Sequence, residues 1–180
     1  MNIKINPFDS DSIKVGIKQL KEIKNNIQYI NDIFMVESLE WIRERANAYL
    51  EERVYAYPNT ANVSDGWEIE IIEPTHTGEL AYRLINRNEL ATYVEFGTGI
   101  EGFFSPHPKA ESEGYEYDLN GHEYNGWRFR FYYKGQWYTY EHFAGYEGKH
   151  YLYDAYYDYF QKKEYINIYR RIFKTMFGTL

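Results

Sequence analysis

The sequence predicts an α+β fold in which a long N-terminal helix packs on a mostly antiparallel β-sheet and the C-terminus is again helical. Apolar residues recur at helical intervals in the first third of the chain, alternate with polar residues in the middle, and return to helical intervals in the last third. A chain of 180 residues is long enough for one sizeable core and short for two. We therefore expect a single domain over 1–180 with three parts: a helical arm (1–57), a β-rich body (58–145) with a loop-rich insertion (100–126), and C-terminal helices (146–180).

The first helix is expected to begin close to Ser10 and to run towards Pro58. Asp9, Ser10 or Ser12 can cap its N-terminus. Its apolar residues follow one another mostly three or four positions apart, with wider gaps after Phe34: Ile13, Ile17, Leu20, Ile23, Ile27, Ile30, Ile33, Phe34, Trp41, Ile42, Ala46, Tyr49 and Leu50. The segment forms either one long bent helix or two, and its apolar stripe needs a sheet face or a neighbouring subunit to cover it.

Alternating apolar and polar residues predict two pairs of antiparallel strands. The first pair is expected over 67–71 and 80–84, where Trp, Ile, Leu and Tyr alternate with polar residues. The second is a hairpin of aromatic-rich strands over 127–133 and 136–140, joined by a Lys-Gly turn. These strands make up the β-rich body.

Helical spacing predicts one helix over 152–160 and another over 165–176. Five basic residues lie on the polar side of this C-terminal region: Lys162, Lys163, Arg170, Arg171 and Lys174. We expect the final helix to pack on its own domain with a solvated basic face. Docking on a partner and lying on a membrane surface stay open as alternatives.

Composition excludes several classes of protein. The chain has no Cys, which excludes disulfides, thiolate metal sites and thiol catalysis, and fits a reducing cytoplasm. It shows no signal sequence and no apolar stretch long enough to span a membrane, so we expect neither secretion by that route nor membrane insertion. Of the net charge of −7, residues 54–160 carry −10 and residues 161–180 carry +4. An acidic body disfavours a DNA-gripping surface and suits one past which DNA slides.

Motifs for catalysis and cofactor binding do not hold up. The segment 97–102 matches GxGxxG, but Pro106 and Pro108 forbid the long helix that a dinucleotide site requires. The histidines show no metal-ligand spacing, and we expect them to face solvent: His76, His107, His122, His142 and His150. We therefore expect no catalytic residue, no metal and no cofactor.

Several carboxylates could take part in acid–base chemistry, but glycoside hydrolysis needs two at a separation that sequence does not define. They are Glu68, Glu70, Glu95, Asp118 and Glu141.

Aromatic residues are dense between residues 124 and 160, where seventeen of 37 residues are Phe, Tyr or Trp. Such a surface suits either a protein interface or the stacking of sugar rings or bases. We favour the interface, because the few basic residues of the hairpin would hold a nucleic-acid backbone poorly.

The segment 93–99 reads Tyr-Val-Glu-Phe-Gly-Thr-Gly. It is followed by Pro-His-Pro at 106–108, a Gly-Tyr-Glu-Tyr-Asp-Leu-Asn-Gly-His stretch at 114–122, and Gly-Trp at 126–127. In this order the motifs resemble those of the neck, head-tail connector or tail-completion proteins of long-tailed bacteriophages, and the resemblance covers about residues 12–160. The hallmark of that family is Tyr-x-x-Glu-Phe-Gly-Thr-Gly, whereas here one residue, Val94, lies between Tyr93 and Glu95. We take ten residues as the structural signature and interface: Tyr93, Glu95, Phe96, Gly97, Thr98, Gly99, Pro106, Pro108, Trp127 and Trp137.

The resemblance implies a virion structural protein without chemistry. Copies would form a homo-oligomeric ring of six or twelve at the head-to-tail junction, link the head connector to the tail, and surround genome DNA without sequence-specific binding. Assembly would take place in the bacterial host cytoplasm, without a membrane. We also expect Gly97 or Gly99 to adopt a positive φ in a sharp turn. The alternative is a carbohydrate-binding or carbohydrate-cleaving tail-associated protein that uses the aromatic-rich hairpin.

Overall fold

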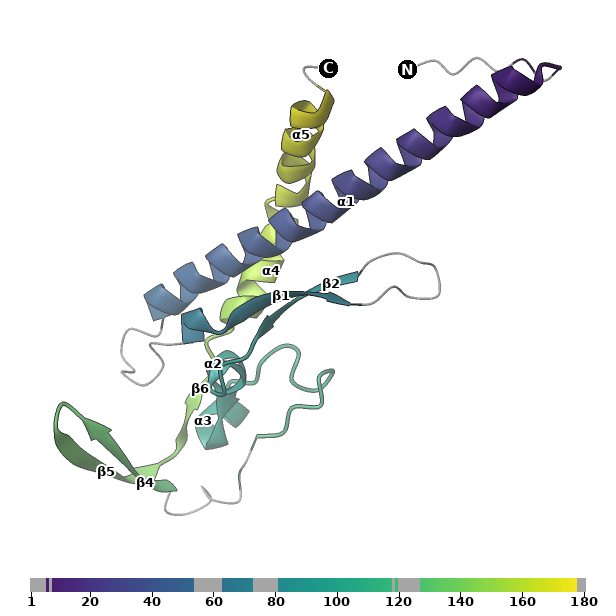
Figure 1. Ribbon diagram of the computed structural model, residues 1–180. Helices are drawn as coiled ribbons and strands as arrows, with labels where there is room; N and C mark the ends of the chain where they lie inside the picture. Colours follow the sequence, from purple (N-terminus) through teal and green to yellow (C-terminus); the bar gives the residue numbers. More distant parts are fainter. Residues whose placement is uncertain are drawn as a thin grey trace.

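The computed structural model describes residues 6, 8–53, 63–72, 81–117, 119 and 127–177, and it confirms the α+β class with helices predominating. The helical elements are α1 (Ser10–Arg53), the 3-10 turn η1 (Val63–Asp65), α2 (Ala91–Phe96), α3 (Gly99–Phe104), α4 (Tyr151–Gln161) and α5 (Glu164–Phe177). The strands are β1 (Trp67–Ile72), β2 (Ala81–Asn86), β3 (Gly97–Thr98), β4 (Trp127–Tyr133), β5 (Gln136–Phe143) and β6 (Gly145–Glu147). Figure 1 shows their arrangement.

The N-terminal third is one continuous helix, α1, of 44 residues. At 1.5 Å per residue it is about 66 Å long. Among the predicted caps, Asp9 is used: its Oδ1 accepts the backbone N–H of Asp11 at 3.0 Å. The C-terminal half of α1 packs against α4 and α5, whereas the N-terminal half extends beyond α5 (Figure 1).

The strands form antiparallel pairs that are separate from one another in the described part of the chain. In the first pair, β1 runs against β2 with Trp67 opposite Asn86. In the second, β4 and β5 form the predicted hairpin, and both turn residues have positive φ, 47° at Lys134 and 83° at Gly135. Two residues of β3 pair with β6. The first pair lies beside the C-terminal half of α1, and Trp67 joins them by donating from Nε1 to Asn47 Oδ1 at 2.7 Å.

The hydrophobic core lies where α1, α2, α4 and α5 meet. Its buried residues are Ile30, Ile42, Ala46, Leu50, Val63, Ala91, Val94, Tyr151, Ala155, Tyr159, Ile168 and Ile172. The buried residues of α1 include a row spaced by four, which is one ridge of a helix facing its neighbours: Ser38, Ile42, Ala46 and Leu50. Helices thus cover the apolar stripe of α1 along its C-terminal half.

The final helix packs on its own domain, as expected. Ile168 and Ile172 form its buried face, and beside them the ring of Tyr169 contacts Phe34 of α1 edge-on at 5.8 Å. Arg171 of its basic face pairs with Glu37 of α1 at 2.7 Å. Within the described residues, no helix combines the length and the apolar character that crossing a bilayer requires.

Candidate functional site

The signature segment turns sharply at two glycines. Gly97 has φ 85° and Gly99 has φ 61°, so the expected positive φ is confirmed at both positions. Gly97 ends α2 in an extended conformation, with ψ 178°, that is essentially restricted to glycine. A Cβ on Gly97 would lie 2.5 Å from the backbone nitrogen of Gly148, so the site needs glycine for space as well.

The signature is one half of a contact between two chain segments. The other half is β6 together with Gly148, and its backbone lies equally close to the signature. A Cβ on Gly145 would lie 2.0 Å from the carbonyl oxygen of Thr98, and a Cβ on Gly148 would lie 2.6 Å from the carbonyl oxygen of Glu95. Sequence reasoning missed both partner glycines. The available signal was their spacing in Ala-Gly-Tyr-Glu-Gly-Lys, directly before the last helices.

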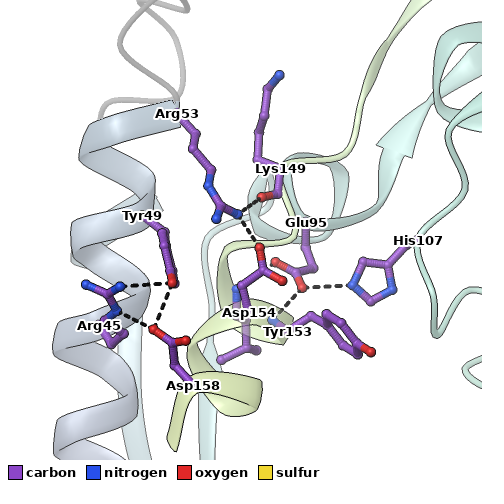
Figure 2. A network of polar contacts seen from close by, with 10 residues as sticks. Arg45, Tyr49, Arg53, Glu95, His107, Lys149, Tyr153, Asp154 and Asp158 are labelled. Carbon is purple, nitrogen blue, oxygen red and sulfur yellow. Dashed lines mark hydrogen bonds and ion pairs between the residues drawn. The ribbon is translucent and has the colours of Figure 1, made fainter. Parts of the chain in front are cut away.

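Glu95 is the centre of this arrangement and is 6% exposed. One carboxylate oxygen accepts the backbone N–H of Leu152 at 2.8 Å, and the other accepts that of Tyr153 at 2.9 Å and the His107 ring Nε2 at 3.0 Å. The two amides belong to the first turn of α4, whose N–H groups have no partner within the helix. Glu95 therefore caps α4 from a distant part of the chain, and its negative charge lies at the positive end of the helix dipole (Figure 2).

His107 completes the cap and is 5% exposed. Its Nδ1 accepts the backbone N–H of Lys109 at 3.0 Å, which places the ring proton on Nε2, facing Glu95. Pro106 and Pro108 flank it at the surface and restrict the backbone there. The expectation that the histidines face solvent is wrong for His107, because this loop turns its imidazole inward to meet a buried carboxylate.

The remaining histidines divide between partial burial and positions outside the description. His150 is half-buried and makes an edge contact with the His107 ring at 4.7 Å between centroids. Burial, and secondarily the neighbouring His107, lowers the pKa of His150. Its Nε2 has no hydrogen-bond partner among the described residues, and the same holds for Thr98 Oγ1. Outside the described part lie His76, His122 and the His142 side chain.

Aromatic rings cover the outer side of the Glu95 cap. Phe96 lies between the His107 ring, at 4.2 Å, and the Tyr115 ring, which it stacks on at 4.6 Å. Tyr115 donates its hydroxyl to the carbonyl oxygen of Gly97 at 2.6 Å, and burial raises the pKa of this tyrosine to about 12. The hydroxyl oxygen of Tyr117 accepts a hydrogen bond from the backbone N–H of His107 at 2.8 Å. The Gly-Tyr-Glu-Tyr stretch of the sequence thus holds the signature turn in place.

A second polar network ties α4 to α1, both at the first turn of α4 and further along the helix (Figure 2). Asp158 accepts hydrogen bonds from Arg45 at 2.9 Å and from the Tyr49 hydroxyl at 2.8 Å. Arg53 bonds to Asp154 at 2.6 Å and to the carbonyl oxygen of Lys149 at 2.7 Å. The pKa of Asp158 responds first to desolvation, which raises it, but hydrogen bonds from Lys162, Tyr49 and Arg45 outweigh that effect and lower it to about 2.

The structure brings together seven of the ten signature residues and leaves three apart. The seven in or beside the cap are Glu95, Phe96, Gly97, Thr98, Gly99, Pro106 and Pro108. Tyr93 is on α2 but 47% exposed. Trp127 and Trp137 are on the β4–β5 hairpin, which stands away from the helices in Figure 1; Trp137 is 62% exposed, and the Trp127 side chain lies outside the described residues.

The carboxylates considered for acid–base chemistry have structural partners where they are described. Glu70 pairs with Arg83 at 2.6 Å, and Glu68 pairs with Arg87 at 2.6 Å, on the exposed side of β1 and β2. Glu95 is occupied by its three hydrogen bonds. Two positions lie outside the described part: Asp118 and the Glu141 side chain.

The polar groups at the centre of this arrangement hold parts of the fold together. Both oxygens of Glu95 and both ring nitrogens of His107 are engaged by the fold itself. Over the described residues, no cluster of three or more His, Asp or Glu side chains could hold a metal ion. The short helix α3 ends at Phe104, before the two prolines, and does not extend into the long helix of a dinucleotide site.

Comparison of the chain with protein-family models, curated proteins and solved structures finds no match.

Proposed function

We propose that the chain is a virion structural protein of the head-to-tail junction of a tailed bacteriophage. In this role it is a neck or tail-completion subunit that forms a ring around the DNA channel and links the head connector to the tail. Its partners are copies of itself, the head connector and tail proteins. The signature residues act by holding the subunit in shape, and no cofactor is involved.

The observation that carries the proposal is the exposure of apolar side chains on projecting elements. Six large apolar residues are exposed on the N-terminal half of α1 alone: Ile13, Val15, Ile17, Leu20, Ile27 and Tyr29. Single exposed apolar residues are ordinary, but four of these six (Ile13, Ile17, Leu20 and Ile27) lie along one face of the extended helix, which is typical of a surface that a partner covers. A subunit of an assembly needs such surfaces.

Two further features support a structural subunit beside DNA. Glu95, His107 and Tyr115 engage their polar groups internally, which suits a protein whose signature residues maintain shape. The middle of the chain is acidic, with −10 over 54–160, and such a surface repels phosphates so that DNA passes without sticking.

The test is quantitative mass spectrometry of purified virions from the phage that carries the coding gene. Copy number is normalised to the portal and tail-tube proteins. A constant six or twelve copies per particle is the expected result, and absence of the protein from intact particles would contradict the proposal.

A carbohydrate-binding or carbohydrate-cleaving tail protein is the second candidate, and exposed aromatic residues on β5 favour it. Trp137 is 62% exposed and Tyr138 is 42% exposed, and exposed aromatic faces can stack on sugar rings. Glycan-array binding by the purified chain, lost in Trp137→Ala, would select this candidate. Absence of glycan binding together with ring copy numbers in virions would reject it.

A further inference from the structure

The N-terminal half of α1 presents an apolar face without cover from its own helices. At about 100° per residue, Ile13, Ile17, Leu20 and Ile27 lie within an arc of about 80°, which also contains Lys24. All four are exposed, three of them close to half or more. The spacing i, i+4, i+7 and i+14 is typical of a helix that binds in an apolar groove of a partner.

The body contains a groove that suits such a helix. It has a volume of about 760 Å³ and lies between α1, α2, α4 and the loop that carries His107. Its aromatic lining comes from Phe96, Tyr115, Tyr153, Tyr156 and Tyr157. Tyr156 and Tyr157 are each 54% exposed, so these rings are available to a partner.

The geometry of α1 prevents the chain from filling this groove with the N-terminal half of its own α1 (residues 10–29, called the arm from here on). Leu39 and Ile42 of α1 form one wall of the groove. Leu20 is 19 residues earlier on the same unbroken helix, about 29 Å away along its axis. The apolar face of the arm therefore reaches such a groove only in another molecule.

Charge favours the same pairing. Residues 10–29 carry four Lys and two acidic residues, a net charge of +2. The loop 106–117, which borders the groove, carries one Lys and three exposed Glu, a net charge of −2 with neutral His107. Two arms packed on each other would instead bring lysines together. Opposite net charges make the groove the better site for the arm.

We infer that the apolar face of residues 13–27 of one copy binds in the tyrosine-lined groove of a second copy. The contact joins two different surfaces, so each copy offers one arm and one groove and successive copies link head to tail. This inference deepens the proposed function and rests on it only for the expectation that copies associate. It names the surfaces through which they do so.

The absence of Cys from the chain allows a direct test by disulfide trapping. Full-length single-cysteine variants are made on the arm (Ile13→Cys, Ile17→Cys, Leu20→Cys) and in the groove (Tyr156→Cys, Tyr157→Cys). Arm and groove variants, one carrying a mass tag, are mixed in pairs and oxidised, because a disulfide forms only where two Cα atoms approach within about 7 Å. Glu22→Cys, on the opposite face of the arm, is the matched control.

The expected result is that at least one arm–groove pair gives a heterodimer at about tenfold the yield of the Glu22→Cys control with the same groove variant. Adding Leu20→Glu to the productive Ile13→Cys or Ile17→Cys arm should return the yield to that of the control, whereas Asn25→Glu, on the polar side of the arm, should leave it unchanged. Arm–arm homodimers in excess over heterodimers, or equal trapping by the control, would overturn the inference.

The two proposals fail separately. Virions that contain six or twelve copies while no arm–groove pair is trapped would refute this contact and leave the neck assignment standing. Efficient arm–groove trapping of a protein that is missing from virions would keep the contact and refute the neck assignment.

Discussion

Removing the Glu95 carboxylate should destabilise the whole domain, because three hydrogen-bond donors depend on it. In Glu95→Ala the amides of Leu152 and Tyr153 and the Nε2–H of His107 lose their acceptor in a site that is more than nine-tenths buried. Hydrogen bonds to a charged group contribute about 1.5–3 kcal/mol each, and loss of a helix N-cap costs about 0.5–2 kcal/mol. These effects are not additive, and we expect a total loss of about 3–5 kcal/mol, because three buried donors are left without their charged acceptor.

The measurement is urea unfolding of the full chain, followed by far-UV circular dichroism, with the free energy of unfolding compared between variants. Glu95→Gln keeps the size of the side chain but replaces one acceptor oxygen by a donor, and we expect it to lose about 1–3 kcal/mol. Glu101→Ala, an exposed acidic residue in the neighbouring helix, is the control and should change stability by less than about 0.5 kcal/mol. A Glu95→Ala variant within about 1 kcal/mol of the parent would show that water replaces the carboxylate and that the cap is not a stabilising feature.

Three further predictions concern the same region. Gly97→Ala should cost several times more stability than Gly114→Ala, because both glycines have positive φ but only at Gly97 would a Cβ meet backbone atoms; equal losses in urea unfolding would contradict this. The pKa of Asp158 is lowered to about 2, so its carboxylate should stabilise the fold above pH 4. As pH falls from about 4 to 2 this contribution should be lost, about 1–2 kcal/mol after allowance for partial exposure of the side chain. Asp158→Asn should flatten that part of the plot of unfolding free energy against pH. The pKa of His150 is below its usual 6.5, so the unfolded chain binds the proton more readily and the free energy of unfolding should decrease as pH falls below 6.5. The charged or titratable neighbours of His150 are Glu95, His107, Asp154 and Glu147. If His150→Asn has the same slope of stability against pH as the parent between pH 6.5 and 5, the prediction is wrong.

Local patterns in the sequence predicted the helices and strands because each depends on neighbouring residues. The spacing of apolar residues from Ile13 to Leu50 defined α1, and alternation around Trp67 defined β1 and its antiparallel partner. The Lys-Gly pair marked a hairpin turn whose residues both adopt positive φ. The choice between one N-terminal helix and two required the packed structure, since the helix gains its stability from contacts of its second half with α4 and α5.

The site was predicted only in part because its contacts join residues far apart in the chain. Glycines at 97 and 99 were recognisable from the sequence, but their need for space depends on Gly145 and Gly148, about 50 residues later. His107 was assigned to the surface because loops are usually exposed. Its burial depends on Glu95, which in turn is held by α4 amides more than 50 residues away. No local pattern contains that relation.

The Glu95 cap and the proposed arm-binding groove share residues, so their stability and binding effects are coupled. Glu95 bonds directly to the backbone of Tyr153 and to His107, and both of these line the groove together with Phe96. A change at Glu95 should therefore weaken arm binding as well as folding. Tyr157, which is 54% exposed, separates the two effects: Tyr157→Ala should lower arm–groove trapping while the free energy of unfolding stays within about 1 kcal/mol of the parent. If Tyr157→Ala lowers the free energy of unfolding by more than about 1 kcal/mol as well as the trapping yield, the groove is part of the core and not a surface for a partner.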